Sequence, residues 1–349
     1  MKPLKIGEYK AKIPLIQGGM GVGISLSSLA GAVAKEGGIG VISTAQIGFS
    51  CSDYLSNPLE ANLRMIGEHI KRAREIAPQG ILGVNIMVAT KEYGSYVKAA
   101  IENGIDMIIS GAGLPLDLPE LARGSKTKLV PIVSSIKAAS VLCKMWDRKH
   151  HTAPDALIVE GPLAGGHLGF RKDEILHYTQ ELFDQQIKGI IQLANQYGKI
   201  YQKEIPVIAA GGIHHRSDTE HYLKLGANGV QIGSQFVTTK ECDANERYKE
   251  AYVKCKKEDI VIVDSPVGMP GRAIANSFVK RMKTGRIPIE HCKGCIRSCR
   301  PSSSPYCIAD ALIRAVTGNV EEGLIFCGAN AHMQTEITTV RDVIKNHFM

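Results

Sequence analysis

Eight short apolar segments recur along the chain, and none of them alternates apolar with polar residues. Each is rich in β-branched residues, and most run directly into glycine or serine. This pattern is typical of strands that are buried on both faces, as in a parallel sheet. The predicted strands cover residues 13–18, 39–44, 81–86, 107–111, 129–134, 156–159, 207–210 and 229–233.

Amphipathic helical patterns fill most of the gaps between these segments. Strict alternation of strand and helix implies right-handed crossovers and a parallel sheet, and eight such units predict an α/β fold of the (β/α)8 or TIM-barrel class. An open doubly wound sheet is the alternative. It is disfavoured because no Gly-x-Gly-x-x-Gly follows the first strand. The predicted helices cover residues 26–35, 59–77, 93–102, 136–146, 180–197 and 218–225.

The chain is predicted to have two parts. Residues 1–240 would form the barrel, and residues 241–349 would form a helical, cysteine-rich extension. No linker rich in proline, glycine or serine precedes the extension, so we expect it to pack on the barrel. In a barrel of this kind the active site lies at the carboxyl ends of the strands.

Composition argues against nucleic-acid and membrane partners. The net charge is only +8 and 5% of residues are aromatic, whereas a nucleic-acid surface needs a basic stripe with stacking aromatics. No segment approaches the roughly 20 apolar residues that cross a bilayer, and the first residues lack the apolar core of a signal peptide. We therefore expect a cytoplasmic protein with reduced thiols or a metal site rather than disulfides.

Three strand ends carry the chemistry. The sixth strand runs into a glycine-rich loop that ends at His167, and the seventh and eighth strands end in Gly211-Gly212 and Gly233-Ser234. Glycines let a flat ligand approach the backbone, and clustered amide donors bind phosphate. A histidine in such a loop can exchange a proton with that ligand. The pattern suggests a flavin enzyme with one acid/base residue. Other histidines lie in polar surroundings and are predicted to be surface residues: His150, His151, His214 and His215.

The motifs at residues 17–21, 164–167, 209–213 and 233–236 together resemble two related enzyme groups. These are the nitronate monooxygenases, formerly called 2-nitropropane dioxygenases, and the FMN-dependent enoyl-acyl-carrier-protein reductase II. Both belong to one superfamily of FMN-binding (β/α)8 barrels, and the resemblance covers about residues 10–285. Gly19 stands where better-known nitronate enzymes often have proline, which matches the reductase group, whereas residues 22–25 look more like the nitronate enzymes.

The resemblance implies a role for each motif residue. His167 would be the catalytic acid/base, and Asn85 would hydrogen-bond the flavin. Ser135 and Glu160 would contact its ring or ribityl chain, although serine after a strand is also a common helix N-cap. The isoalloxazine ring would lie along the first strand end, and the phosphate would lie at the last two. The implied cofactor-binding residues are Gln17, Gly18, Gly19, Met20, Asn85, Ser135, Glu160, Gly165, Gly211, Gly212, Gly233 and Ser234.

Three functions follow from this reading. The first is an FMN-dependent monooxygenase that oxidises alkyl nitronates with O2. The second is an NAD(P)H-dependent enoyl-acyl-carrier-protein reductase of fatty-acid synthesis, with an enoyl thioester as its small-molecule substrate. The third is a flavin-binding sensor built on the cysteines. The sequence leaves open whether the chain is a monomer or a homodimer.

The extension carries a compact cysteine motif with C-x2-C-x3-C spacing. Its members are Cys292, Cys295 and Cys299, and Cys307 follows closely. The spacing resembles the iron–sulfur site of the trimethylamine dehydrogenase and dienoyl-CoA reductase group, in which the fourth cysteine lies further away. Four thiolates could also hold zinc. The third interpretation is a set of reduced thiols, so the sequence leaves an iron–sulfur cluster, zinc and no metal open.

Overall fold

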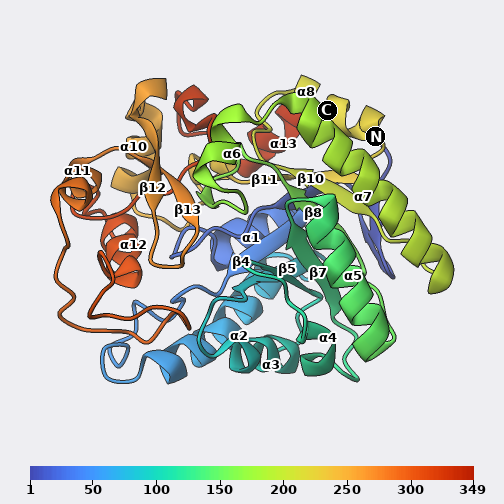
Figure 1. The fold of residues 1–349 in the computed structure, drawn as a ribbon, viewed down its shortest axis with the longest axis horizontal. Helices are drawn as coiled ribbons and strands as arrows, with labels where there is room; N and C mark the ends of the chain where they lie inside the picture. Colours follow the sequence, from blue (N-terminus) through green and yellow to red (C-terminus); the bar gives the residue numbers. More distant parts are fainter.

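A computed structural model describes all residues, 1–349, and contains a closed barrel of eight parallel strands. The eighth strand pairs with the first and closes the barrel, so the predicted (β/α)8 fold is confirmed (Figure 1). The barrel strands are β3 (Leu15–Gln17), β4 (Ile39–Ser43), β5 (Ile81–Met87), β6 (Met107–Gly111), β7 (Lys128–Val133), β8 (Leu157–Glu160), β10 (Val207–Ala210) and β11 (Gly229–Ile232).

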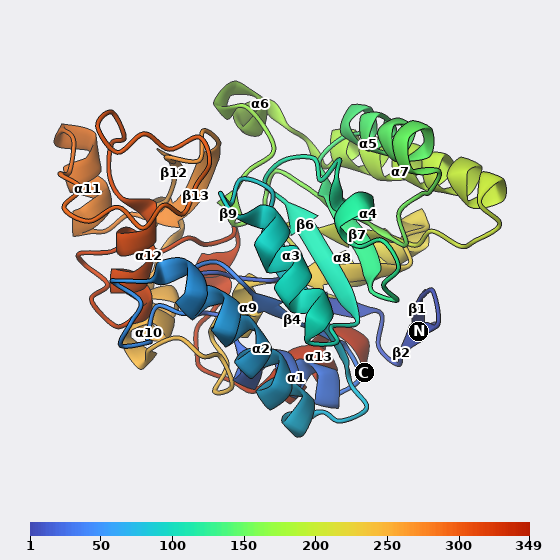
Figure 2. The ribbon, with the colours of Figure 1, turned by 90° about the horizontal axis from the view of Figure 1, so that it is seen from below.

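An outer layer of helices surrounds the strands (Figures 1 and 2). The last helix of the chain, α13 (Val340–Phe348), returns to this layer and packs against the first and eighth helices. The end of the extension therefore completes the ring around the barrel. The other helices of the layer are α1 (Ser27–Lys35), α2 (Pro58–Ile76), α3 (Tyr93–Glu102), α4 (Leu118–Leu121), α5 (Ile136–His150), α7 (Gln180–Ile200) and α8 (Arg216–Leu225).

Apolar side chains fill both sides of the barrel wall. Val41, Ile109 and Ile158 lie in a cluster inside the barrel, and a larger cluster fills the space between the strands and the helices. Burial of both faces explains why the strands show no alternation in sequence. The N-terminal hairpin of β1 (Leu4–Ile6) and β2 (Tyr9–Ala11) adds its apolar residues to the inner cluster.

The part of the extension at about residues 246–316 lies on the opposite side of the barrel from that hairpin, whereas the end of α13 lies near the N-terminus (Figures 1 and 2). The extension is not purely helical, because it contains a β-hairpin that the sequence analysis missed. The hairpin pairs with a short strand from the loop after β8 and forms a three-stranded sheet. The sheet consists of β9 (Gly166–His167), β12 (Ile260–Asp264) and β13 (Pro270–Ile274). The extension also contains α10 (Glu246–Lys254), α11 (Ser277–Thr284) and α12 (Ile308–Val316), and two short helices, α6 (Lys172–His177) and α9 (Ser234–Val237), precede it in the chain.

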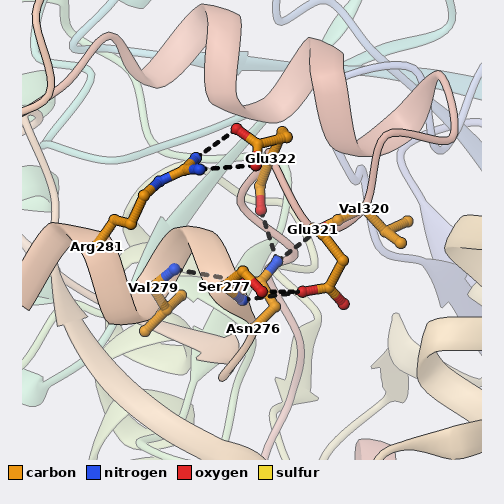
Figure 3. A network of polar contacts seen from close by, with 8 residues as sticks. Asn276, Ser277, Val279, Arg281, Val320, Glu321 and Glu322 are labelled. Carbon is orange, nitrogen blue, oxygen red and sulfur yellow. Dashed lines mark hydrogen bonds and ion pairs between the residues drawn. The ribbon is translucent and has the colours of Figure 1, made fainter.

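A polar network holds the extension together (Figure 3). The Asn276 side chain accepts a hydrogen bond from the Val279 N–H at 3.0 Å and so caps α11. Its Nδ2 donates to the carbonyl of Gly323 at 2.8 Å. Arg281, one turn along α11, pairs with the Glu322 carboxylate at 2.7 Å. These contacts fix α11 to the segment after α12.

No helix of the protein combines the length and the apolar character needed to span a bilayer.

Candidate active site

One cavity opens at the carboxyl ends of the barrel strands, and the extension supplies part of its wall. Eleven of the thirteen site residues expected from the sequence line it. The strand ends provide most of the barrel side, and Val267, Ile308 and Phe326 come from the extension. The expected residues that line the cavity are Gly18, Gly19, Met20, Asn85, Glu160, Gly165, His167, Gly211, Gly212, Gly233 and Ser234.

Two expected residues, Gln17 and Ser135, lie outside the cavity lining. The Gln17 side chain is fully buried, where its Oε1 accepts from the Val41 N–H at 2.9 Å and its Nε2 bonds the Gly18 carbonyl. Ser135 caps α5, because its hydroxyl accepts from the Ala138 N–H at 3.2 Å. Gln17 therefore braces the first strand end, and Ser135 fills the N-cap role that its sequence position also allowed.

The glycines of the cavity have two different physical explanations. Gly211 and Gly212 have φ angles of +97° and +77°, where side chains are strained. A Cβ on Gly19 would lie 2.3 Å from the Asn85 Cβ, so packing requires glycine there. Gly233 is different, because its φ is −113° and a Cβ would meet only Met20, with the sulfur at 3.5 Å. The protein itself does not need glycine at 233, which suits a position kept open for a ligand.

His167 is held at the cavity wall by the hairpin of the extension. Its strand, β9, pairs with β13 so that His167 lies opposite Gly271. The ring Nε2 is 2.8 Å from the Ser265 hydroxyl oxygen, which also accepts the Val267 N–H at 3.3 Å. The ring packs edge-on against Phe326 with the centroids 5.0 Å apart. Nδ1 has no hydrogen-bond partner in the chain, so it is the nitrogen that remains free for a ligand.

Burial sets the protonation of His167 and of Glu160. Loss of hydration lowers the pKa of His167 to about 4, so its imidazole is neutral at neutral pH and can accept a proton. The same effect raises the pKa of Glu160, at the end of β8, to about 7. The Glu160 carboxyl makes no hydrogen bond within the chain and lines the cavity. The site therefore holds one neutral base and one carboxyl that titrates near neutral pH.

The loop before His167 is fixed by Arg272, which the sequence analysis did not identify. This guanidinium is buried and donates to the carbonyls of Pro162, at 2.8 Å, and of Ala164. Arg272 and Ser265 both belong to the hairpin, about 100 residues downstream of the histidine. The run Ile-Val-Ile-Val at 260–263 was the signal that could have revealed this hairpin.

The sequence left an iron–sulfur cluster, zinc and no metal open for the four cysteines of the extension, and the structure shows no preformed metal site there. No group of three or more His, Cys, Asp or Glu side chains is arranged to hold a metal ion. Cys292 is exposed, the Cys299 sulfur lies 3.7 Å from the Ser304 hydroxyl, and Cys307 begins α12. Cys295 lines the cavity, and burial together with the neighbouring thiols raises its pKa to about 12.

The surface location predicted for four histidines is correct for only two. His151 and His215 are exposed, whereas His150 is partly buried and its Nε2 is 3.0 Å from the Leu116 carbonyl. His214 is also partly buried, and it lines the cavity beside Gly212. Polar neighbours in sequence misled the prediction, because the strand end turns His214 toward the site.

The fold and the site together are those of a (β/α)8-barrel enzyme with a histidine and glycine-rich strand ends at its carboxyl mouth. A family model described as nitronate monooxygenase matches residues 2–348, and the chain belongs to this family of oxidoreductases.

Individual relatives are similar but distant. A probable nitronate monooxygenase of Staphylococcus saprophyticus is 27% identical over 300 residues, which cover 79% of each chain. A probable nitronate monooxygenase of Staphylococcus aureus is 26% identical over 315 residues, again 79% of each. FabK from Thermotoga maritima superposes with a TM-score of 0.70 and 26% identity, covering 96% of this chain and 91% of its own. A nitroalkane oxidase from Streptomyces ansochromogenes has a TM-score of 0.71 over 96% and 94% of the chains, and at 18% identity it supports the fold alone.

Proposed function

We propose that this protein is an FMN-dependent nitronate monooxygenase, which oxidises alkyl nitronates with O2. The observation that carries the proposal is the neutral, partly buried His167 on the wall of a cavity whose other side is formed by glycine-rich strand ends. Family membership and the names of the staphylococcal relatives support the same reaction class.

The cavity residues fit FMN. Gly233 leaves room for a phosphate beside its backbone, and the Ser234 hydroxyl accepts the Gly328 N–H at 3.0 Å, which leaves its own proton to donate. Gly19 and Met20 would lie along the isoalloxazine ring, and Asn85 would hydrogen-bond it. When bound, FMN supplies the redox chemistry by taking electrons from the nitronate and passing them to O2.

His167 would handle the proton of the substrate. A neutral nitroalkane must lose its α-proton before it becomes the nitronate anion. The free Nδ1 of a neutral imidazole is suited to take that proton, and the Ser265 hydroxyl at Nε2 holds the ring in place. The resulting imidazolium would then stabilise the adjacent nitronate by charge. A preformed nitronate has already lost that proton, so its oxidation does not need the proton-transfer step.

The apolar wall of the extension favours a second candidate, the NAD(P)H-dependent reduction of an enoyl thioester. Ile296, Ile308, Leu312 and Phe326 line the cavity beyond the strand ends and would suit an apolar acyl chain. The two functions share the FMN site and differ in electron donor.

The proposal is tested first by the cofactor and by oxygen uptake. The purified protein is expected to be yellow and to release FMN, rather than FAD, on acid treatment. It should consume O2 on addition of an alkyl nitronate without NAD(P)H. Release of FAD, or a colourless protein that ignores added FMN, would refute the cofactor assignment. Turnover that depends on NAD(P)H and an enoyl thioester would establish the second candidate instead.

A further inference from the structure

His214 lies at the end of the cavity where the phosphate-binding glycines gather. It follows Gly211 and Gly212 directly, at the carboxyl end of β10. Its side chain lines the cavity together with Gly212, Gly233 and Ser234.

Two amide groups fix the proton on the His214 ring. Gln235 Nε2 lies 3.1 Å and Gln334 Nε2 lies 3.0 Å from the ring Nδ1. An amide NH2 can only donate, so Nδ1 must accept and carries no proton. The neutral ring therefore has its proton on Nε2. Nε2 has no partner in the chain.

The orientation of Gln235 is itself fixed by a buried chain of hydrogen bonds. Its Oε1 lies 2.9 Å from Nε2 of His347 on α13, and His347 Nδ1 lies 2.9 Å from the Thr219 hydroxyl on α8. If Thr219 donates to Nδ1, His347 must donate from Nε2 to Gln235, and Gln235 must present its NH2 to His214. His347 and Thr219 are almost fully buried, and burial lowers the pKa of His347 to about 4. No residue of this hydrogen-bonded series is therefore charged at neutral pH.

We infer that His214 binds the phosphate group of FMN, to which it donates a hydrogen bond from Nε2–H. The donor has no partner in the protein, its residue lines the same cavity as Gly212 and Gly233, and its ring is oriented by residues of α8, α9 and α13. A phosphate oxygen is a strong acceptor, and hydrogen bonds to charged groups are stronger than those between neutral groups. The inference rests on the proposed FMN cofactor.

Burial supports a neutral donor rather than a cation. Loss of hydration, and then the nearby His215, lower the pKa of His214, and His332 acts in the same direction while Asp218 opposes it. Protonation of Nδ1 would also set a third N–H against two amide donors. His214 therefore offers the phosphate a directed hydrogen bond from a neutral ring and does not add a full positive charge to the site.

The test compares FMN with riboflavin, which lacks the phosphate. Dissociation constants of both flavins are measured on the full-length apoprotein by fluorescence quenching. His214→Ala is expected to weaken FMN binding about 10- to 100-fold and to leave riboflavin binding unchanged. His214→Gln keeps an N–H donor at a similar reach and is expected to recover much of the loss. His215→Asn is the matched control, because it changes the exposed neighbour, keeps a residue suited to cap α8, and should bind FMN normally.

The outcomes separate this inference from the proposed function. Unchanged FMN affinity in His214→Ala, or an equal loss for FMN and riboflavin, would overturn the phosphate role. A wild-type protein that binds neither flavin would overturn the FMN proposal and this inference with it. Thermal melting of each apoprotein shows whether a variant is folded, and His214→Gln keeps the test decisive if the alanine variant is not.

Discussion

Replacing His167 with alanine is expected to lower kcat/KM for a neutral nitroalkane about 10²- to 10⁴-fold, the usual loss when a general base is removed. The partly buried, neutral imidazole has a free Nδ1 at the cavity wall, and no other histidine ring shares its position on β9. FMN binding should persist. Steady-state kinetics with a nitroalkane and with its preformed nitronate provide the measurement.

The comparison between the two substrates is the internal control for His167. The preformed nitronate has already lost its proton, so its loss of rate should be smaller. Ser265→Ala should reduce turnover less than His167→Ala, because it removes only the group that orients Nε2. Burial lowers the pKa of His167, so the basic form is present above about pH 4 and is lost as the pH falls through that value. Equal turnover by His167→Ala and wild type on both substrates would show that the residue is structural.

Gly233→Asp is expected to abolish FMN binding at working concentrations. A carboxylate about 4 Å from a phosphate is opposed by about 4 kcal/mol per pair of unit charges near a protein surface, which corresponds to an affinity loss on the order of 10³-fold. The apoprotein should still fold, because φ at 233 is −113° and a Cβ there makes only ordinary contact with Met20. Flavin content after purification and titration with FMN measure the effect.

Two further variants divide the Gly233 effect into bulk and charge. Gly233→Ala adds only the Cβ, and Gly233→Asn adds a neutral side chain of the same shape as aspartate. FMN affinity should fall in the order Ala, Asn, Asp if a phosphate lies beside this residue. A yellow Gly233→Asp protein with normal FMN affinity would place the phosphate elsewhere.

The barrel could be predicted because its determinants are local in sequence. Segments such as 156–159 and 207–210 are apolar throughout, and the strands they form are buried on both faces. Their ends carry the glycines and His167, and parallel strands in a barrel must bring those ends to one mouth. Most of the residues that meet at this mouth could therefore be predicted from the sequence.

The supporting contacts could not be predicted because they join distant segments. Ser265 and Arg272 reach His167 and its loop only because β13 pairs with β9, and no local pattern specifies that pairing. His214 has polar neighbours in sequence yet lines the cavity. Cysteine spacing likewise does not specify ligand geometry. The thiols of Cys292, Cys299 and Cys307 lie near enough to Cys295 to raise its pKa, yet no group of side chains is arranged to hold a metal ion.

Anaerobic mixing of the FMN-loaded protein with either an alkyl nitronate or NADH tests the central claim most directly. Without O2 the electrons from a true donor remain on the flavin, so its yellow colour is lost. We predict that the nitronate bleaches the protein within the time of turnover and that NADH does not. Bleaching by NADH, with no change on addition of nitronate, would contradict the assignment as a nitronate monooxygenase.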